Sequence, residues 1–127
     1  MVGMVIVSHS ETLAKGVVEL SLLMAEGAPI AAAGGMEDGG FGTSYEKISA
    51  AIDAVDQGDG VVVLMDMGSA VMTAEMVLED KGKDNIVMVD CPLVEGAVAA
   101  AVSLSTGDAL EDVIQAAQEV REDRKLQ

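Results

Sequence analysis

VVVLMDMGS at residues 61–69 joins an apolar run directly to a short polar segment, and MVIVSHSE at residues 4–11 repeats this arrangement. Runs of β-branched and apolar residues without polar alternation are typical of strands that are buried on both faces. Two further runs of this kind occupy residues 29–33 and 86–89. Four buried strands are therefore predicted, and the first and third lead directly into polar residues.

Segments with helical spacing lie between these strands. In the first two segments, apolar residues recur three or four positions apart, which places one apolar stripe toward the protein interior. These residues are Leu13, Val17, Leu20, Met24, Ile48, Ile52 and Val55. Further helices are predicted at about residues 69–79, at about 93–104 and from about residue 109 onward.

The predicted strands and helices alternate, and a second helix follows the last one. Such alternation produces an open parallel sheet with helices on both faces, because each crossover is right-handed. We therefore expect an α/β fold with a four-stranded parallel sheet in the order 2-1-3-4. In this order the chain leaves strands 1 and 3 in opposite directions and opens a crevice beyond their carboxyl ends. No repeat or linker is evident, so we expect one domain over residues 1–127.

The charge of the chain restricts its partners. It carries 22 acidic and 7 basic side chains, for a formal net charge of −15. This charge repels the phosphate backbone of nucleic acids and the surface of an anionic membrane, so neither is expected as a partner. A basic partner protein would be attracted, although solubility alone explains an acidic surface equally well.

Cysteine usage and hydropathy indicate the compartment. Cys91 is the only cysteine, so no intramolecular disulfide can form, and we expect it to be a small buried side chain at a strand end. No basic segment precedes an N-terminal apolar stretch, and no apolar run approaches the roughly 20 residues that span a bilayer. We expect a cytoplasmic protein without membrane insertion.

The candidate catalytic residues are His9 and Asp66, which follow strands 1 and 3. The predicted strand order makes these two positions neighbours. An imidazole can act as a nucleophile, a general base or a metal ligand, but a single histidine excludes a multi-histidine metal site. A carboxylate that accepts a hydrogen bond from one ring nitrogen orients the ring and makes the other nitrogen a better nucleophile.

Ser10, Gly68 and Ser69 are candidate phosphate-binding residues. They lie near predicted helix starts, where free backbone N–H groups and the positive end of the helix dipole suit phosphoryl oxygens. The serine hydroxyls would add further donors. The simplest alternative is that His9 and Ser10 only cap a helix.

A serine hydrolase is a second alternative. Ser69 would be its nucleophile, with His9 and either Asp66 or Asp90 as the other members of a triad. However, residues 67–71 read MGSAV and lack the final glycine of a nucleophile elbow, which disfavours this interpretation.

Residues 34–44 read GGMEDGGFGTS and resemble a phosphate-binding loop only in their glycine content. They contain neither the Walker lysine nor the spacing of a dinucleotide-binding loop. We expect a mobile or sharply turned loop over the crevice. Thr43 would then start the next helix, with Glu46 as the second member of a capping pair.

Four methionines cluster around the end of the third strand. They are Met65, Met67, Met72 and Met76. Exposed methionines would suit an adaptable docking surface, but core filling is the role expected for most of them.

Three segments resemble a known family. They read VIVSHS at residues 5–10, MDMGSA at residues 65–70 and PLVEG at residues 92–96. All three look like DhaM, the phosphotransferase subunit of the bacterial dihydroxyacetone kinases that use phosphoenolpyruvate. The first domain of DhaM is similar to the mannose-type IIA domains of the sugar phosphotransferase system. The resemblance extends over essentially the whole chain and implies a mannose-type IIA-like fold.

The resemblance implies a phosphohistidine carrier. His9 would accept phosphate from phospho-HPr and deliver it to ADP bound to the subunit DhaL, in a system that also contains DhaK. Asp66 would hold Nδ1 of the ring and leave Nε2 for the phosphate. The family further implies a homodimer that needs no cofactor or metal. Some DhaM proteins continue into HPr-like and enzyme-I-like domains, and here we expect separate HPr and enzyme I to supply the phosphate.

Two alternative functions remain open. A sugar-transport IIA protein would deliver its phosphate to a IIB domain, but that branch carries a second glycine and a proline around the serine. Residues 68–70 read GSA here, which favours the DhaM branch. A non-enzymatic regulatory module that binds a partner through its acidic surface is the remaining alternative.

Overall fold

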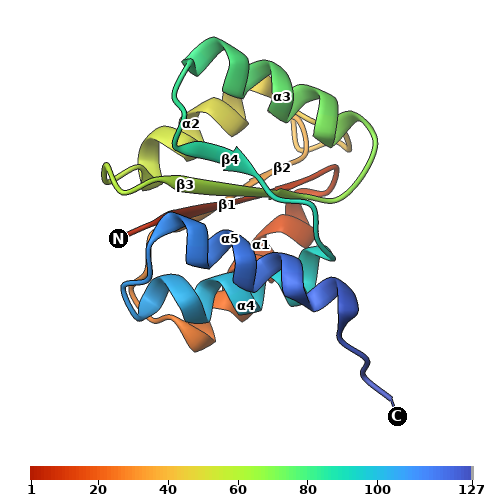
Figure 1. Cartoon of the computed structure of the whole chain (residues 1–127). Coiled ribbons are helices and arrows are strands. Elements are labelled where there is room, and N and C mark those ends of the chain that lie inside the picture. Colours follow the sequence, from red (N-terminus) through yellow and green to blue (C-terminus); the bar gives the residue numbers. More distant parts are fainter. Residues whose placement is uncertain (127) are drawn as a thin grey trace.

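The structure is a computed structural model that describes residues 1–126. Its strands are β1 (Gly3–Ser8), β2 (Ile30–Gly34), β3 (Val61–Met65) and β4 (Ile86–Met88). They form one sheet in the order β2-β1-β3-β4, and all three neighbouring pairs are parallel (Figure 1). The α/β class and the strand order predicted from the sequence are confirmed.

Helices cover both faces of the sheet. They are α1 (Glu11–Met24), α2 (Tyr45–Val55), α3 (Ser69–Lys81), α4 (Leu93–Ser105), α5 (Leu110–Glu119) and the short 3-10 helix η1 (Val120–Glu122). Figure 1 shows α2 and α3 on one face and α1, α4 and α5 on the other. The predicted alternation, with two helices after the last strand, is therefore confirmed.

The central strand β1 is buried on both of its faces. Met4 and Ile6 belong to the core under α1, α4 and α5, whereas Val5 and Val7 belong to the core under α2 and α3. All four side chains are 0% exposed. Successive side chains of a strand point to opposite faces, so a strand covered on both sides shows no polar alternation.

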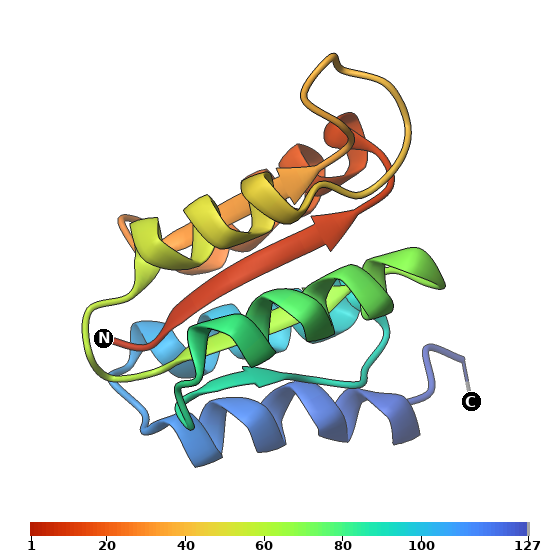
Figure 2. The ribbon, with the colours of Figure 1, turned by 90° about the horizontal axis from the view of Figure 1, so that it is seen from above.

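The register of β1 and β3 positions the residues that follow them. Val7 pairs with Met65 at the carboxyl end of the two strands. The residues that follow β1 and β3 therefore leave the sheet side by side. Figure 2 shows that the loop between β2 and α2 also arches beyond the end of β1, so three segments meet at this edge.

The buried face of α1 differs from the predicted one. Leu13, Leu20 and Met24 are 44%, 42% and 54% exposed, so their predicted inward position was wrong. The buried residues of α1 are Ala14, Val17 and Ser21. The helix lies very close to β2: a Cβ added to Gly34 would be only 2.7 Å from the Cβ of Ala14. Small side chains fit this contact and leucines do not.

Serines begin the first two helices. The Ser10 Oγ accepts a hydrogen bond from the N–H of Leu13 at 3.1 Å, and the Ser44 Oγ accepts one from the N–H of Lys47 at 3.1 Å. Each bond satisfies one of the free N–H groups at a helix start. The sequence predicted Thr43 as the start of α2, which was wrong by one residue, so the Thr43 hydroxyl is not used as a cap.

Two glycines of this region allow opposite stability predictions. A Cβ at Gly34 would lie 2.5 Å from the backbone oxygen of Ser10 and force α1 away from the sheet. We expect Gly34→Ala to lower the free energy of unfolding by about 1–3 kcal/mol, as overpacking does in well-packed cores. Urea denaturation followed by circular dichroism measures this value.

Gly16 provides the matched control. It lies in the interior of α1, and a Cβ there would have no atom within 4 Å. Gly16→Ala should raise the free energy of unfolding by roughly 0.5–1 kcal/mol, because alanine loses less backbone entropy in a helix. Equal effects of the two alanines would contradict the close packing of α1 on β2.

Candidate functional site

His9 and Asp66 meet beyond the ends of β1 and β3. The Nδ1 atom of His9 lies 3.0 Å from Oδ1 of Asp66, and the backbone N–H of His9 donates to Oδ2 at 3.0 Å. The side chains are 29% and 16% exposed, respectively, so the carboxylate is shielded from water while the ring stays accessible. The two residues lie side by side, as the strand order led us to expect.

Both oxygens of Asp66 accept two hydrogen bonds. Oδ1 also accepts from the N–H of Met67 at 2.7 Å, and Oδ2 also accepts from the Ser8 hydroxyl at 2.8 Å. Burial raises the pKa of Asp66, but the hydrogen bonds from the backbone and ring of His9, the Ser8 hydroxyl and the Met67 N–H outweigh this effect. They hold the pKa of Asp66 below its usual value and keep the carboxylate ionised.

This carboxylate determines which ring nitrogen of His9 carries the lone pair. An ionised carboxylate only accepts hydrogen bonds, so the proton resides on Nδ1 and the lone pair on Nε2. The Nε2 atom lies 2.8 Å from the Oγ of Ser69, whose hydroxyl therefore donates to it. The lone pair of His9 thus faces the start of α3.

The start of α3 offers unused backbone donors. Gly68 precedes the helix with a φ of 51°, a conformation that favours glycine, and no side chain caps it. Within residues 1–126, the N–H groups of Gly68 and Ser69 have no hydrogen-bond partner. Free N–H groups and the helix dipole together favour an anion at this point. The start of α3, which carries these free N–H groups, therefore adjoins Nε2 of His9 through Ser69.

Ser10 has a different position in the site. Its hydroxyl caps α1, and its backbone N–H donates to the Oγ of Ser8 at 3.0 Å. In the described part of the chain it makes no hydrogen bond with the His9 ring. Ser10 thus caps the start of α1, as the capping alternative predicted for it.

Three residues near the site were not predicted from the sequence to belong to it. Ser8 is fully buried and links the N–H of Ser10 to Asp66. Thr43 places its Oγ1 2.9 Å from the Oγ1 of Thr73 and 3.4 Å from the Oγ of Ser69. One signal was available, because Thr73 lies one helical turn after Ser69 and hence on the same face of α3.

Large apolar side chains are exposed near this site. Met67, Met72 and Met76 are 68%, 67% and 58% exposed, and Phe41 in the neighbouring loop is 86% exposed. The prediction that most of the clustered methionines fill the core was wrong, since only Met65 is buried. The buried face of α3 uses smaller residues instead. They are Ala70, Ala74 and Val77.

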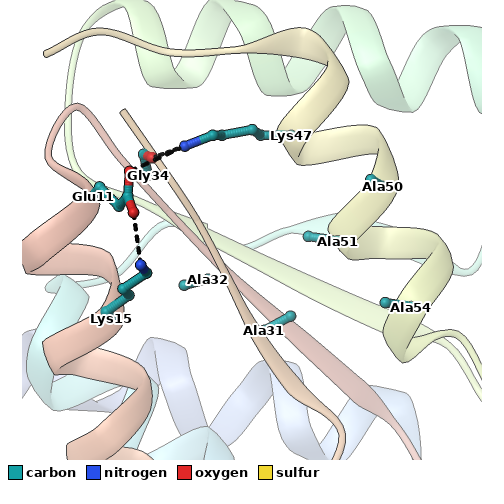
Figure 3. Close-up of a pocket in the computed structure, with 9 residues that line it drawn as sticks. All are labelled: Glu11, Lys15, Ala31, Ala32, Gly34, Lys47, Ala50, Ala51 and Ala54. Carbon is teal, nitrogen blue, oxygen red and sulfur yellow. Dashed lines mark hydrogen bonds and ion pairs between the residues drawn. The ribbon is translucent and has the colours of Figure 1, made fainter. Parts of the chain in front are cut away.

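A groove beside the edge strand β2 lies apart from these residues. Alanines from β2 and α2 line it, together with Glu11, Lys15 and Lys47 (Figure 3). Lys15 and Lys47 lie 2.6 and 3.4 Å from the Glu11 carboxylate, and Lys47 also donates to the backbone oxygen of Gly34 at 3.0 Å. Hydrogen bonds from these lysines lower the pKa of Glu11. The one carboxylate of the groove is therefore paired with both of its lysines.

Residues 1–126 offer little support for metal binding, thiol chemistry or membrane insertion. No three of their His, Cys, Asp and Glu side chains gather in a way that could hold a metal ion. Cys91 is half-buried, and burial raises the pKa of its thiol to about 11, so the reactive thiolate is scarce. None of the helices in the same range is both long and apolar enough to span a bilayer.

Comparison with known proteins assigns the chain to a family. The family model EIIA-man, described as PTS system fructose IIA component, matches residues 3–114. The chain belongs to the EIIA-man family. A solved structure of the phosphotransferase system component EIIA from Streptococcus agalactiae has the same fold as this EIIA-man chain, with a TM-score of 0.68 at 15% identity. The match covers 98% of this chain and 97% of that one.

Curated relatives of this EIIA-man chain are phosphoryl donor subunits of dihydroxyacetone kinases. The DhaM subunit of Escherichia coli K12 is 42% identical over 90% of this chain and 26% of its own length. A DhaM subunit of Listeria innocua is 40% identical over 80% of this chain and 81% of its own length. The resemblance to DhaM is thereby confirmed. The chain spans about a quarter of the length of the first three curated relatives.

The four hydrogen bonds on Asp66 imply a pH dependence of stability. The folded pKa is depressed, so the contribution is complete above the ordinary value of 3.8 and is lost as the pH falls through the lower folded value. Asp66→Asn turns an N–H₂ group toward two donors and removes this contribution. The variant should therefore be less stable at pH 7, and the difference should shrink below about pH 3.8.

Urea denaturation of both proteins across this pH range measures the difference. Asp84→Asn is the matched control, because Asp84 is exposed and accepts no side-chain hydrogen bond within the described residues. It should shift stability little at either pH. A constant difference between Asp66→Asn and the unaltered chain from pH 7 to pH 3 would contradict the assigned role of the carboxylate.

Proposed function

We propose that this chain is a phosphohistidine carrier whose His9 Nε2 accepts a phosphoryl group from phospho-HPr. The carrier passes it to ADP bound to DhaL, in a dihydroxyacetone kinase that also contains DhaK. The observation that carries the proposal is the 3.0 Å contact between Nδ1 of His9 and the Asp66 carboxylate. It commits the lone pair to Nε2, which lies beside Ser69 and the open start of α3.

Each transfer forms one bond to phosphorus and breaks another. On phosphorylation, the Nε2 lone pair attacks phosphorus, and the bond to the donor imidazole breaks with its electron pair left on the donor. The His9 ring then carries a positive charge, which the Asp66 carboxylate stabilises through Nδ1–H. On delivery, a terminal phosphate oxygen of ADP attacks phosphorus, and the electron pair returns to Nε2.

The site holds a phosphoryl group without a charged donor of its own. In residues 1–126, no lysine or arginine makes an ion pair with Asp66 or a hydrogen bond with His9 or Ser69. Neutral hydroxyl and N–H donors bind an anion more weakly than guanidinium or ammonium groups do. Weak binding suits a carrier, because a phosphoryl group that is held tightly is slow to leave.

The surface around His9 suits a protein partner. The exposed side chains of Met67, Met72 and Phe41 lie on the segments that adjoin the site. Exposed apolar patches mark interaction surfaces, and methionine adapts to more than one partner. The net charge of −15 favours partners with basic surfaces.

The DhaL-bound ADP is favoured over a IIB domain as recipient. Residues 68–70 read GSA and lack the second glycine and the proline of the sugar-transport branch. The named relatives at 42% and 40% identity are DhaM subunits. These two observations support the dihydroxyacetone kinase system.

One observation favours a second candidate function. Ser69, His9 and Asp66 are connected through contacts of 2.8 and 3.0 Å in the manner of a serine hydrolase triad. A hydrolase would use Ser69 rather than His9 as its nucleophile. The membership of the EIIA-man family favours the carrier.

We expect incubation with phosphoenolpyruvate, enzyme I and HPr to yield an acid-labile, base-stable phosphoprotein. His9→Gln should reduce labelling by at least about 100-fold, since His9 is the only histidine and covalent catalysis depends on it. Labelling is followed with ³²P-phosphoenolpyruvate, and circular dichroism checks the fold of the variant. Undiminished labelling of His9→Gln would contradict the carrier, and so would labelling of Ser69 by a serine-directed phosphonate.

The recipient can be identified directly. The phosphorylated protein, mixed with DhaL that carries ADP, should lose its phosphate and yield ATP in equal amount. A mannose-type IIB domain in place of DhaL should remain unphosphorylated on the same time scale. Luciferase detection of ATP and gel separation of phosphoproteins measure the two outcomes. The reverse pattern would place the chain in the sugar-transport branch.

A further inference from the structure

The glycine-rich loop between β2 and α2 is bound to the end of β1. The N–H of Gly42 donates to the backbone oxygen of His9 at 2.9 Å, and the N–H of Gly35 donates to that of Ser8 at 3.1 Å. Both ends of the loop are therefore attached directly at the His9 segment. The residue after Gly42 is thereby held beside the site.

That residue is Thr43, and its hydroxyl points to the start of α3. Its Oγ1 lies 2.9 Å from the Oγ1 of Thr73 and 3.4 Å from the Oγ of Ser69. The hydroxyl is available for these contacts because Ser44, and not Thr43, caps α2. Thr43 is half-buried, so its position is defined by packing as well as by hydrogen bonds.

These contacts form a row of hydroxyls that ends on His9. Ser69 donates to Nε2, and its oxygen can then accept a hydrogen bond from Thr43, whose oxygen can accept one from Thr73. When Nε2 forms a bond to phosphorus, Ser69 loses its acceptor. Its O–H must turn to a phosphoryl oxygen, and the oxygen of Ser69 no longer occupies the space in front of the ring.

We propose that Thr43 is a second neutral hydroxyl donor to the phosphoryl group on His9, supplied by the glycine-rich loop. This inference rests on the proposed function. The 3.4 Å contact between Thr43 and Ser69 in the free site is long, so Thr43 gives up little when it turns to a phosphoryl oxygen. The ligand class is a phosphoryl anion on an imidazole nitrogen, and no proton is gained or lost when the hydroxyls turn.

Thr73 positions Thr43 in this arrangement. The 2.9 Å hydrogen bond between their hydroxyls links the loop to α3, the helix that also carries Ser69. The β-branched threonine side chain has fewer rotamers than serine, which limits the directions of the hydroxyl. The loop therefore presents a donor at a defined place without adding a charge that would slow onward transfer.

The lifetime of the phosphohistidine tests this inference. The protein is phosphorylated with phosphoramidate, a small donor that requires no partner protein, and loss of the phosphate is followed by ³¹P NMR. Transfer from nitrogen has a loose transition state, so a donor to the phosphoryl oxygens stabilises the bound state more than the transition state. Thr43→Val should shorten the lifetime by about threefold to tenfold, the effect of one neutral hydrogen bond.

Two variants serve as controls. Thr43→Ser retains a hydroxyl and should restore most of the lifetime that Thr43→Val loses. Thr106→Val removes a hydroxyl at the end of α4, which bonds only to the backbone oxygen of Ser103, and should leave the lifetime unchanged. An unchanged or longer lifetime in Thr43→Val, with normal labelling of His9, would overturn this inference alone. If the unaltered chain takes no phosphate on His9 from either phosphoramidate or phospho-HPr, the proposed function falls together with it.

Discussion

The contact between the Asp66 carboxylate and Nδ1 of His9 is the interaction on which the site depends. It joins two segments that are 57 residues apart in the chain, and it determines which nitrogen carries the lone pair. The carboxylate remains ionised because four donors compensate for its partial burial. A neutral amide at this position would leave two of those donors facing an N–H₂ group, which is itself a donor.

The sheet makes this contact possible. Parallel pairing of β1 and β3 ends at Val7 and Met65, so the segments that follow these strands continue as neighbours at one edge of the sheet. From there the segment after β1 enters α1 on one face, and the segment after β3 enters α3 on the other face. This divergence leaves the start of α3 open beside Nε2. A buried sheet with little freedom thus holds an accessible ring and a set of unused donors in one place.

Sequence reasoning succeeded where the pattern was local and strong. The apolar runs of β1 and β3 predicted buried strands, and their alternation with helices predicted the strand order that places His9 next to Asp66. It failed where an element has two apolar sides. Leucines and methionines of α1 and α3 resemble core residues in the sequence, but the fully buried positions of these helices hold alanine, valine and serine instead. The excess apolar surface is left on the outside.

The sequence by itself determined the fold class, the strand order and the pairing of the only histidine with one aspartate. These follow from periodicity and from the chirality of crossovers, which act on short stretches of chain. Only the tertiary structure decided which ring nitrogen of His9 faces Asp66, which serine caps which helix, and that the Thr43 hydroxyl lies beside Ser69. Each of these depends on hydrogen bonds between segments far apart in the chain, whose geometry no local pattern encodes.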